Sequence, residues 1–321
     1  MISVKKINTK AILIKKFKLK NKNALIIGFG SIGRKHFSII KKLNIFKKIY
    51  ILTKQKKNLN LISSLKEIQS IKPHYIIISS RTNMHFSQLR TLEKKIKNTY
   101  ILVEKPLFGK KQILNIKRNK VFVGYNLRFH PVLTFLKKFL QKKKIFSINI
   151  VCKSYLPNWR KNIHYSKSNS SKKSYGGGAL LELSHELDYL QWLFGKIKKI
   201  EFSKLRKVSN LNVDCEDSAL IIGKTDFSHF LLDLNFYSTR PERTLKIDGR
   251  NFSIKADLIK NQIEILKGRK LKIIKFNNNK NTSYNKLHNA ILTKKLKNVC
   301  SYSEGKNLMN IIEEIKEKNI K

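Results

Sequence analysis

The chain has 321 residues, of which 41% are hydrophobic, so it can form two domains with their own cores, and wholesale disorder is excluded. Its three cysteines are widely spaced and fit neither a disulfide framework nor a zinc site, so we expect no metal and a reducing, cytoplasmic compartment. No apolar run is long enough for a secretory signal or a membrane span, so we expect no membrane partner.

The formal net charge of +49 raises the question of nucleic-acid binding. Residues 1–150 carry 36 Lys and Arg against three acidic residues, and residues 151–321 carry 33 against 17. The lysines are spread beside abundant Ile and Asn, as AT-rich codon usage would produce, and no zinc finger, helix-turn-helix or RNA-binding motif accompanies them. We expect no specific nucleic-acid partner, while non-specific attraction of polyanions stays open.

The first 22 residues, Met1 to Lys22, are basic and contain one short apolar run. We expect a basic N-terminal extension there, or an added edge strand. The patterns that follow divide the rest of the chain into a dinucleotide-binding domain at residues 23–127 and a second domain at residues 128–321.

The first strong pattern is a glycine turn between a strand and a helix. Apolar residues 24–27 suit a strand buried on both faces, a helical stripe follows the glycines, and a second strand is expected at 48–52. This βαβ unit predicts an α/β fold that begins with a Rossmann-type, doubly wound parallel sheet. A plain α/β turn without a ligand is the alternative.

The spacing of the glycines, Gly-x-Gly-x-x-Gly, predicts a dinucleotide site. Gly28 would make the bend, Gly30 would leave room for a pyrophosphate, and Gly33 would let helix and strand pack closely. The predicted cofactor contacts in this turn are Gly28, Gly30, Ser31, Ile32 and Gly33.

The end of the second strand is where the ribose of such a cofactor would lie. NAD-binding proteins usually place an acid there, whereas this chain has Thr53 and Lys54. A hydroxyl and a cation suit a 2′-phosphate better than a 2′-hydroxyl, so NADP is mildly favoured over NAD.

Two further strands are expected to end at the same crevice. The strand at 75–79 runs into a polar turn with Asn83 and His85, which we count as cofactor contacts, although helix capping would also explain the asparagine. The strand at 100–103 runs into Glu104 and Lys105. We count Glu104 as a further cofactor contact, and it could also orient the lysine. A partly desolvated lysine can exchange a proton with a substrate hydroxyl; a surface ion pair is the alternative.

These motifs resemble the Gfo/Idh/MocA oxidoreductases, named for glucose-fructose oxidoreductase and inositol dehydrogenase. The resemblance covers most of the chain and lies in Gly28-Phe29-Gly30-Ser31-Ile32-Gly33 with His36 three residues on, Thr82-Asn83-Met84-His85, Glu104-Lys105-Pro106, and Gly124-Tyr125-Asn126-Leu127-Arg128-Phe129-His130-Pro131. It implies that Lys105 lies by the nicotinamide and contacts the reacting hydroxyl. It also implies that residues 128–131 cross into the second domain.

The second domain is expected to begin with a helix at 132–140 and a strand at 145–155, followed by a long polar loop. Side chains of this loop could reach the crevice, where a guanidinium would grip a carboxylate or phosphate. The candidate substrate contacts are Arg128, Trp159, Arg160, Tyr165 and, from the next helix, Glu182. An ordered surface loop is the alternative.

A helix rich in leucine is expected from about residue 180 to Gly195, in a stretch without Lys or Arg. Glu182, His185 and Asp188 lie three apart, so they would share one face, and two carboxylates flanking an imidazole could fix its tautomer for proton transfer. A metal site is the alternative, but no further ligands are evident. By resemblance, His185 is the proton-transferring histidine, Asp188 the acid behind it, and Glu182 an ancillary acid.

The remaining sequence predicts an α+β domain with an open, largely antiparallel sheet, closed by two helices that return to the first domain. The expected strands are 199–208, 217–223, 227–237, 243–248, 252–257 and 262–266, and the expected helices are 284–297 and 304–318. By resemblance, such a sheet pairs subunits, which implies a homodimer or homotetramer.

The patterns together predict an NAD(P)-dependent oxidoreductase that transfers a hydride between nicotinamide and a sugar, nucleotide-sugar or cyclitol carbinol. The loop around Trp159 hints at nucleotide sugars and polysaccharide biosynthesis by resemblance. One alternative is a related enzyme that uses transient oxidation to cleave glycosides or to eliminate. The other is a non-catalytic dinucleotide sensor or polyanion-binding protein.

Overall fold

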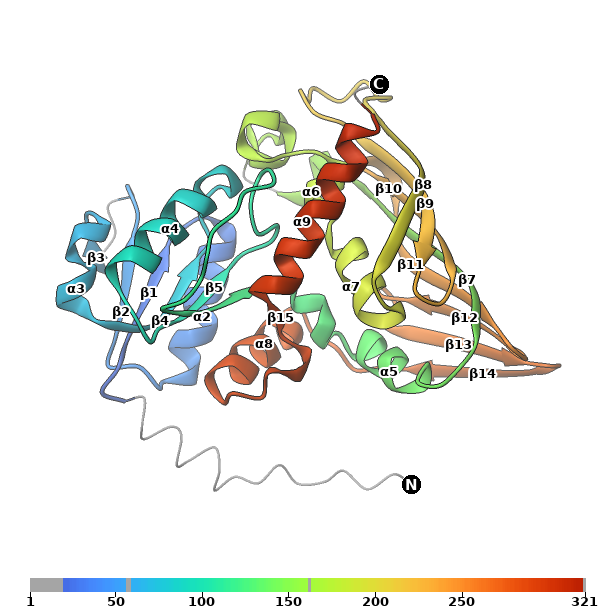
Figure 1. Ribbon diagram of the computed structural model, residues 1–321, viewed down its shortest axis with the longest axis horizontal. Helices are drawn as coiled ribbons and strands as arrows, with labels where there is room; N and C mark the ends of the chain where they lie inside the picture. Colours follow the sequence, from blue (N-terminus) through green and yellow to red (C-terminus); the bar gives the residue numbers. More distant parts are fainter. Residues whose placement is uncertain (1–19, 56–58, 161–162, 320–321) are drawn as a thin grey trace.

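The computed structural model describes residues 20–55, 59–160 and 163–319, so nearly all of the expected N-terminal extension lies outside the described residues. Two β-sheets stand apart, and the helix α9 (Tyr302–Glu317) runs between them and contacts strands of both (Figure 1). None of the described helices combines the length and apolar composition needed to cross a membrane.

Sheet A is the parallel sheet expected from the N-terminal half. Its order is β15-β6-β5-β4-β1-β2-β3, and all neighbours are parallel except β15, which is antiparallel to β6. Its strands are β1 (Asn23–Ile27), β2 (Lys48–Leu52), β3 (Asn60–Ile62), β4 (Pro73–Ile78), β5 (Tyr100–Val103), β6 (Lys120–Val123) and β15 (Cys300–Ser301). The apolar strands β4 and β5 are almost wholly buried, as strands covered on both faces must be.

The helices of this half are α2 (Ser31–Leu43), α3 (Ile68–Ile71) and α4 (His85–Lys95). Short 3₁₀ turns precede α3 and α4 at η1 (Leu65–Glu67) and η2 (Thr82–Met84), and η3 (Asn126–Phe129) leads to the second sheet. Backbone bonds continue past the strand ends, from Ser79 N–H to the Ile27 carbonyl and from Glu104 N–H to the Ile78 carbonyl, both at 2.8 Å. The turns after β1, β4 and β5 therefore lie along one edge of the sheet.

Sheet B has the order β14-β13-β12-β11-β7-β10-β9-β8, and only the pair β7 and β10 is parallel. Its strands are β7 (Ile145–Tyr155), β8 (Ile197–Arg206), β9 (Ser218–Thr225), β10 (His229–Asn235), β11 (Tyr237–Gly249), β12 (Phe252–Asp257), β13 (Gln262–Lys267) and β14 (Lys270–Lys275). Buried and exposed residues alternate along β12, which is typical of a sheet with one covered face. The α/β plus α+β fold class expected from the sequence is confirmed.

The helices associated with sheet B are α5 (Pro131–Phe139), α6 (Ala179–Glu182) and α7 (His185–Phe194). The loop after β7 contains the 3₁₀ turns η4 (Leu156–Trp159), η5 (Tyr165–Lys167), η6 (Asn169–Ser171) and η7 (Lys173–Tyr175). In Figure 1, α5, α6 and α7 lie on the side of sheet B that faces sheet A.

The single helix expected through His185 is wrong, because the structure breaks it into α6 and α7 at Leu183 and Ser184. In a continuous helix the Glu182 carbonyl would accept the N–H of Glu186. Instead that N–H bonds the Leu183 carbonyl at 3.3 Å, and the Glu182 carbonyl accepts from the ammonium of Lys105 at 2.8 Å. The break therefore frees a carbonyl for a side chain of the first half.

The C-terminal segment returns to sheet A. The helix α8 (Thr282–Leu292) lies against η3 and α2, and η8 (Leu296–Asn298) leads to β15. The helix expected at 284–297 thus ends earlier, where Lys294 has a positive φ of 60°. The predicted boundary between residues 127 and 128 stays a prediction, since β15 comes from beyond it.

Candidate active site

The three glycines of the turn after β1 have different surroundings. Gly28 has a φ of +90°, and a Cβ placed on it would lie 2.6 Å from the backbone of Ser80. A Cβ on Gly33 would lie 2.2 Å from the carbonyl oxygen of Gly28. A Cβ on Gly30 would meet nothing within 4 Å. Protein packing therefore requires the first and third glycines, whereas the second faces open space.

The N-terminus of α2 has the properties of an anion site. Gly30 is its N-cap, no side chain caps the helix, and its first turn, which includes Ser31 and Ile32, contains no acid. The free N–H groups and the positive end of the helix dipole thus adjoin the open space at Gly30. This surrounding fits the pyrophosphate of a dinucleotide.

The end of β2 lies beside this turn, because the Gly28 N–H donates to the Leu52 carbonyl at 2.9 Å. Lys54 is exposed, and the Thr53 hydroxyl accepts from the N–H of Gln55 at 3.2 Å. A contact of these two residues with a cofactor ribose stays a prediction.

The turn after β4 reaches the second half of the chain. The Asn83 amide donates to the Ser174 carbonyl at 3.0 Å, and the Arg81 guanidinium lies 4.0 Å from the centre of the Tyr175 ring. No side-chain cap is formed at η2 or α4, so the capping alternative for Asn83 is wrong. The turn joins the two halves of the chain beside the glycine turn.

His85 is buried at the start of α4. Its Nε2 lies 3.2 Å from the Ser80 carbonyl, and its Nδ1 lies 3.2 Å from the carbonyl of Pro106. The imidazole therefore ties the turn after β4 to the turn after β5. A cofactor contact by His85 stays a prediction, and it would require these bonds to change.

Lys105 is held by the second half of the chain. Its ammonium donates to the Glu182 carbonyl at 2.8 Å and to Glu182 Oε2 at 3.1 Å. The expected pair with Glu104 is wrong: that carboxylate bonds Nε2 of His36 at 2.8 Å and the backbone N–H of Lys105 at 3.2 Å. Glu182 thus takes the orienting role that the sequence suggested for Glu104, and a cofactor contact by Glu104 stays a prediction.

The Glu182 carboxylate joins the lysine to the loop after β7. Its Oε1 accepts from the Ser170 hydroxyl at 2.9 Å. Burial alone would raise the pKa of Glu182, but Lys105 and Ser170 outweigh burial and hold the pKa below its usual value. Glu182 is therefore ionised at neutral pH.

His185 lies at the start of α7, edge-on to the Tyr125 ring at 5.5 Å. Burial, followed by the charges of Lys105 and Arg243, puts the pKa of His185 well below its usual value. Its Nδ1 is buried and has no hydrogen-bond partner in the described part of the chain. The imidazole is therefore neutral and able to accept a proton.

The expected flanking of His185 by Glu182 and Asp188 is wrong. Glu182 bonds Lys105, and Asp188 accepts three hydrogen bonds from the Arg128 guanidinium at 2.7, 3.0 and 3.2 Å. Arg128 also donates to Glu304 at 2.7 Å. Because this guanidinium is buried and used by two carboxylates, it clamps η3, α7 and α9 together. Substrate contact by Arg128 and a catalytic role of Asp188 stay predictions, without support from this geometry.

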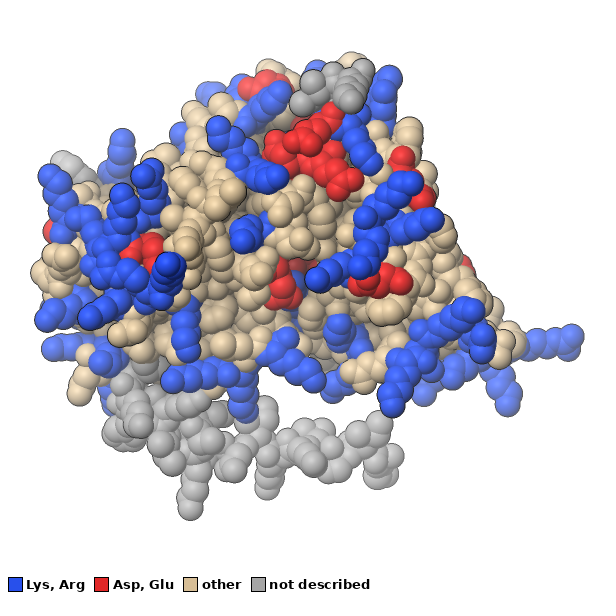
Figure 2. Space-filling view, viewed as in Figure 1, with Lys and Arg blue, Asp and Glu red and all other residues tan. Residues whose placement is uncertain are grey.

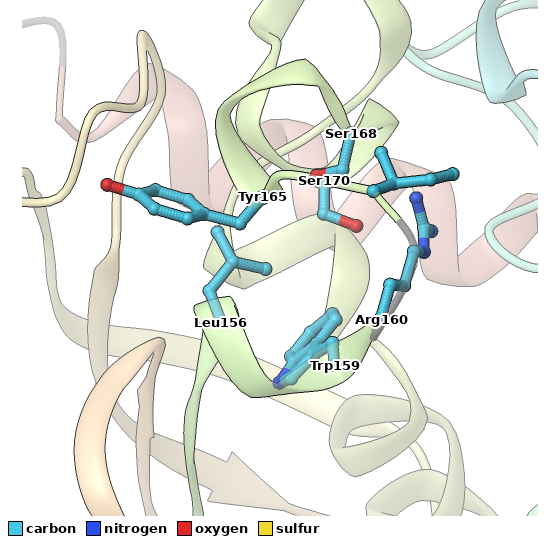
Figure 3. A pocket seen from close by; sticks show the side chains of 7 residues that line it. Leu156, Trp159, Arg160, Tyr165, Ser168 and Ser170 are labelled. Atoms are coloured by element: carbon cyan, nitrogen blue, oxygen red, sulfur yellow. The ribbon is translucent and has the colours of Figure 1, made fainter.

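The loop after β7 forms a narrow hollow, without room for a water molecule, that is lined by Leu156, Trp159, Arg160, Ile163, Tyr165, Ser168 and Ser170. Figure 3 shows Trp159 and Arg160 at one side of it and the Tyr165 hydroxyl pointing away. The Trp159 indole donates to Ser154 at 3.1 Å, and the Tyr165 hydroxyl accepts from the Asn212 N–H at 3.0 Å. Of the predicted substrate contacts in this loop, Arg160 is thus the best placed.

Other charged groups near the site were not expected from the sequence. Arg243 on β11 donates to Glu186 at 2.7 and 3.1 Å, which places a second ion pair next to His185. These residues lie 57 positions apart, so no local pattern connects them. Ser170 was missed for the same reason, since a serine in a polar loop carries no signal of its own.

Two broader expectations can be compared with the structure. Within the described ranges, no group of three or more His, Cys, Asp or Glu side chains could hold a metal ion. On the face that Figure 2 shows, Lys and Arg are scattered over both halves of the molecule and interrupted by acidic groups. They do not form a single basic stripe on that face.

A family model described as "Oxidoreductase family, C-terminal alpha/beta domain" matches residues 144–321. No curated protein matches the chain. Among solved structures, levoglucosan dehydrogenase in complex with NADH superposes with a TM-score of 0.81 at 15% identity, over 94% of this chain and 97% of that chain.

Two nucleotide-sugar dehydrogenases also superpose. UDP-N-acetylglucosamine 3-dehydrogenase GnnA from Acidithiobacillus ferrooxidans has a TM-score of 0.72 at 13% identity, over 92% of this chain and 97% of that chain. The WlbA dehydrogenase from Bordetella pertussis, in complex with NADH and UDP-GlcNAcA, has a TM-score of 0.71 at 13% identity, over 93% and 96%. At these identities the likeness shows a shared fold.

Proposed function

Because this chain belongs to the Gfo/Idh/MocA oxidoreductase family, we propose that it is a dehydrogenase that uses NAD or NADP and acts on a CH–OH group of a sugar, nucleotide sugar or cyclitol. The single observation that carries the proposal is the position of Lys105. Its ammonium leaves the parallel sheet at the end of β5 and is held by Glu182 from the second half of the chain. An oriented cation beside a neutral histidine is what alcohol oxidation requires.

The residues around the glycine turn fit the cofactor. Gly28, Gly30 and Gly33, with the free N–H groups at Ser31 and Ile32, would hold its pyrophosphate, and Thr53 and Lys54 would lie by its ribose. A bound nicotinamide supplies the acceptor or donor of the hydride. The lysine at the end of β2 favours NADP, and the NADH in the solved neighbours favours NAD.

Lys105 would stabilise charge on the substrate oxygen. As a hydroxyl loses its proton, the ammonium at hydrogen-bond distance attracts the developing alkoxide. Glu182 accepts two bonds from the lysine, so it limits the rotamers of a long side chain and aims the remaining donor.

His185 would take the hydroxyl proton and return it in the reverse reaction. Its low pKa keeps the imidazole in the base form at neutral pH. Burial, followed by the charges of Lys105 and Arg243, lowers that pKa, so the protonated imidazole is a ready proton donor in the reverse reaction.

The substrate would occupy the region between Lys105 and the hollow of the loop after β7. Ser170 and Glu182 connect the two, and Arg160 offers a guanidinium for a carboxylate or phosphate. This arrangement, together with the nucleotide sugars acted on by GnnA and bound to WlbA, favours a charged sugar over a neutral one. The same resemblance supports a cytoplasmic homodimer or homotetramer.

The first test is fluorescence titration with NADH and NADPH at moderate salt, which suppresses non-specific attraction of phosphates to so basic a chain. Saturable binding is expected, and Lys54→Asp should weaken NADPH more than NADH. A panel of sugars and nucleotide sugars is then tested for reduction of added NAD⁺ or NADP⁺. No binding of either nucleotide would overturn the proposal. Substrate cleavage with the cofactor unchanged would instead identify transient oxidation.

A further inference from the structure

Four buried side chains form an unbroken line of hydrogen bonds behind the Lys105 turn. Glu104 Oε1 lies 2.8 Å from His36 Nε2, and His36 Nδ1 lies 2.8 Å from His288 Nε2. The Nδ1 of His288 lies 2.9 Å from the Tyr75 hydroxyl. Glu104 is 6% exposed and the other three are fully buried, so water does not compete for these bonds.

The line joins separate parts of the fold. Glu104 follows β5, His36 lies on α2 and Tyr75 on β4, while His288 comes from α8, which is 252 positions away from His36. The chemistry proposed above uses none of these histidines. The line therefore needs its own explanation.

The donor and the acceptor of each hydrogen bond in the line can be assigned from the acceptor at its end. A carboxylate only accepts, so His36 donates from Nε2, and its Nδ1 then accepts from Nε2 of His288. The Nδ1 of His288 in turn accepts from the phenol of Tyr75. Burial raises the pKa of Tyr75 and lowers that of His288, so the phenol keeps its proton and this imidazole stays neutral.

If every hydrogen bond in the line were donated in the opposite direction, one proton would have no acceptor. If His36 carried two protons, His288 would donate to Tyr75, and the phenol proton would need another partner. The described part of the chain gives the Tyr75 hydroxyl no second hydrogen bond. The forward direction satisfies every donor in the line.

We infer that Tyr75, His288 and His36 are positioning residues whose aligned hydrogen bonds occupy Oε1 of Glu104 and fix its place, so that the ammonium of Lys105 remains free for Glu182. Among the described residues, no lysine or arginine lies within 4.0 Å of the Glu104 carboxylate oxygens. Without its donors, this carboxylate would be the nearest acceptor along the chain for its neighbour Lys105. The ammonium would then turn away from the crevice.

The effect on catalysis rests on the proposed function, whereas the direction of the protons does not. The first test therefore uses the wild-type protein without substrate. In ¹⁵N-histidine-labelled protein at neutral pH, His36 and His288 should each show a protonated Nε2 and an unprotonated Nδ1, assigned with the variants His36→Gln and His288→Gln. A proton on Nδ1 of either residue would overturn the inference.

The second test measures kcat, KM and the dissociation constant of the cofactor. His288→Leu removes the donor to His36 and should lower kcat about tenfold with both constants little changed. His288→Gln can still donate an amide N–H to His36 and should recover most of kcat. Tyr284→Phe is the matched control, because the Tyr284 ring contacts His36 edge-on at 5.4 Å but is not a member of the line.

A lower melting temperature with unchanged kcat in His288→Leu would reduce the line to a structural role and overturn the inference. If that variant does not fold, Tyr75→Phe serves instead: it removes only the donor to Nδ1 of His288, so it should shift the resonance of that nitrogen and lower kcat. An unchanged kcat in Tyr75→Phe would contradict the inference. If the wild-type protein oxidises no substrate, the proposed function fails, while the tautomers still decide the direction of the line.

Discussion

Two carboxylates in the second half of the chain each pair with a cation of the first half. The two pairs differ in their exposure and in their number of hydrogen bonds. Glu182 holds Lys105 by one carboxylate oxygen, and the two side chains are 18% and 17% exposed. Asp188, six positions on, grips Arg128 with both oxygens, and those side chains are 3% and 4% exposed. The first pair can open toward a substrate, whereas the second is sealed within the fold. Exposure and bond number thus separate a reactive pair from a clamp better than sequence spacing does.

The largest expected effect is the loss of kcat when the partly exposed pair of Lys105 and Glu182 is broken. Lys105→Met should lower kcat about 10³-fold, because a preorganised charge at the substrate oxygen is lost. The melting temperature and NADH binding should change little, since a half-open ion pair adds little stability. Lys153→Met is the matched control, because Lys153 pairs with Asp233 in sheet B and those two side chains are also partly exposed, at 29% and 30%. Equal turnover of the two variants would refute the role of Lys105.

Breaking the buried pair of Arg128 and Asp188 should lower the free energy of unfolding. Arg128→Met leaves Asp188 buried without its partner, so the free energy of unfolding should fall by about 3 kcal/mol. Urea denaturation measures this change, and the exposed Arg250→Met is the control, with an expected change of about 0.5 kcal/mol or less. A stable Arg128→Met protein with greatly reduced substrate affinity would instead support the original prediction that Arg128 contacts the substrate.

A smaller effect is expected when only the charge of Glu182 is removed. Glu182→Gln keeps the shape and one acceptor, so kcat should fall about tenfold rather than 10³-fold. Because the pKa of Glu182 is lowered in the folded state, its contribution to stability is present above the unfolded value of 4.5 and is lost as pH falls through the folded value. The wild-type protein should therefore lose its stability advantage over Glu182→Gln in acid. If the wild-type protein stayed more stable than Glu182→Gln at all pH values, the conclusion that Glu182 is ionised in the folded state would be wrong.

The smallest expected effect is the pH dependence that His185 gives to kcat/KM and to stability. His185 lies near the pair of Lys105 and Glu182. Its pKa lies well below the ordinary 6.5, so the acid limb of kcat/KM should also lie well below pH 6.5. The sign for stability follows: the unfolded state takes up the proton first, so stability is lost as pH falls below 6.5. A pH–rate profile checks the first statement, and His185→Gln should remove the limb. A limb at 6.5 would show that the imidazole is more solvated than the structure indicates.

The sequence predicted what depends on local pattern. The glycine turn, the parallel strands β1, β2, β4 and β5, and the position of Lys105 at a strand end all follow from periodicity and spacing over short distances. The parallel strand β6 was not predicted. The strands β3 and β15 were missed because they have three and two residues, too few to show a period. The strand β14 was missed because nearly all of it is exposed, so it lacks the alternation of a half-buried strand.

Partners of charged groups could not be predicted in the same way. Leucine spacing runs without interruption through Leu183, so nothing in the sequence marks the break between α6 and α7. Lys105 and Glu182 are 77 positions apart, and Arg128 and Asp188 are 60 apart. Which acid meets which cation is decided when the two halves pack, after local structure has formed.

The strand β15 has a consequence for how the protein is made. Sheet A gains its edge strand from residues 300–301, and α8 supplies the histidine that completes the line behind Lys105. The ribosome delivers both only after the whole of sheet B, so the half of the protein that is synthesised first is finished last. A nascent chain arrested before residue 282 would therefore leave the β6 edge of sheet A unpaired.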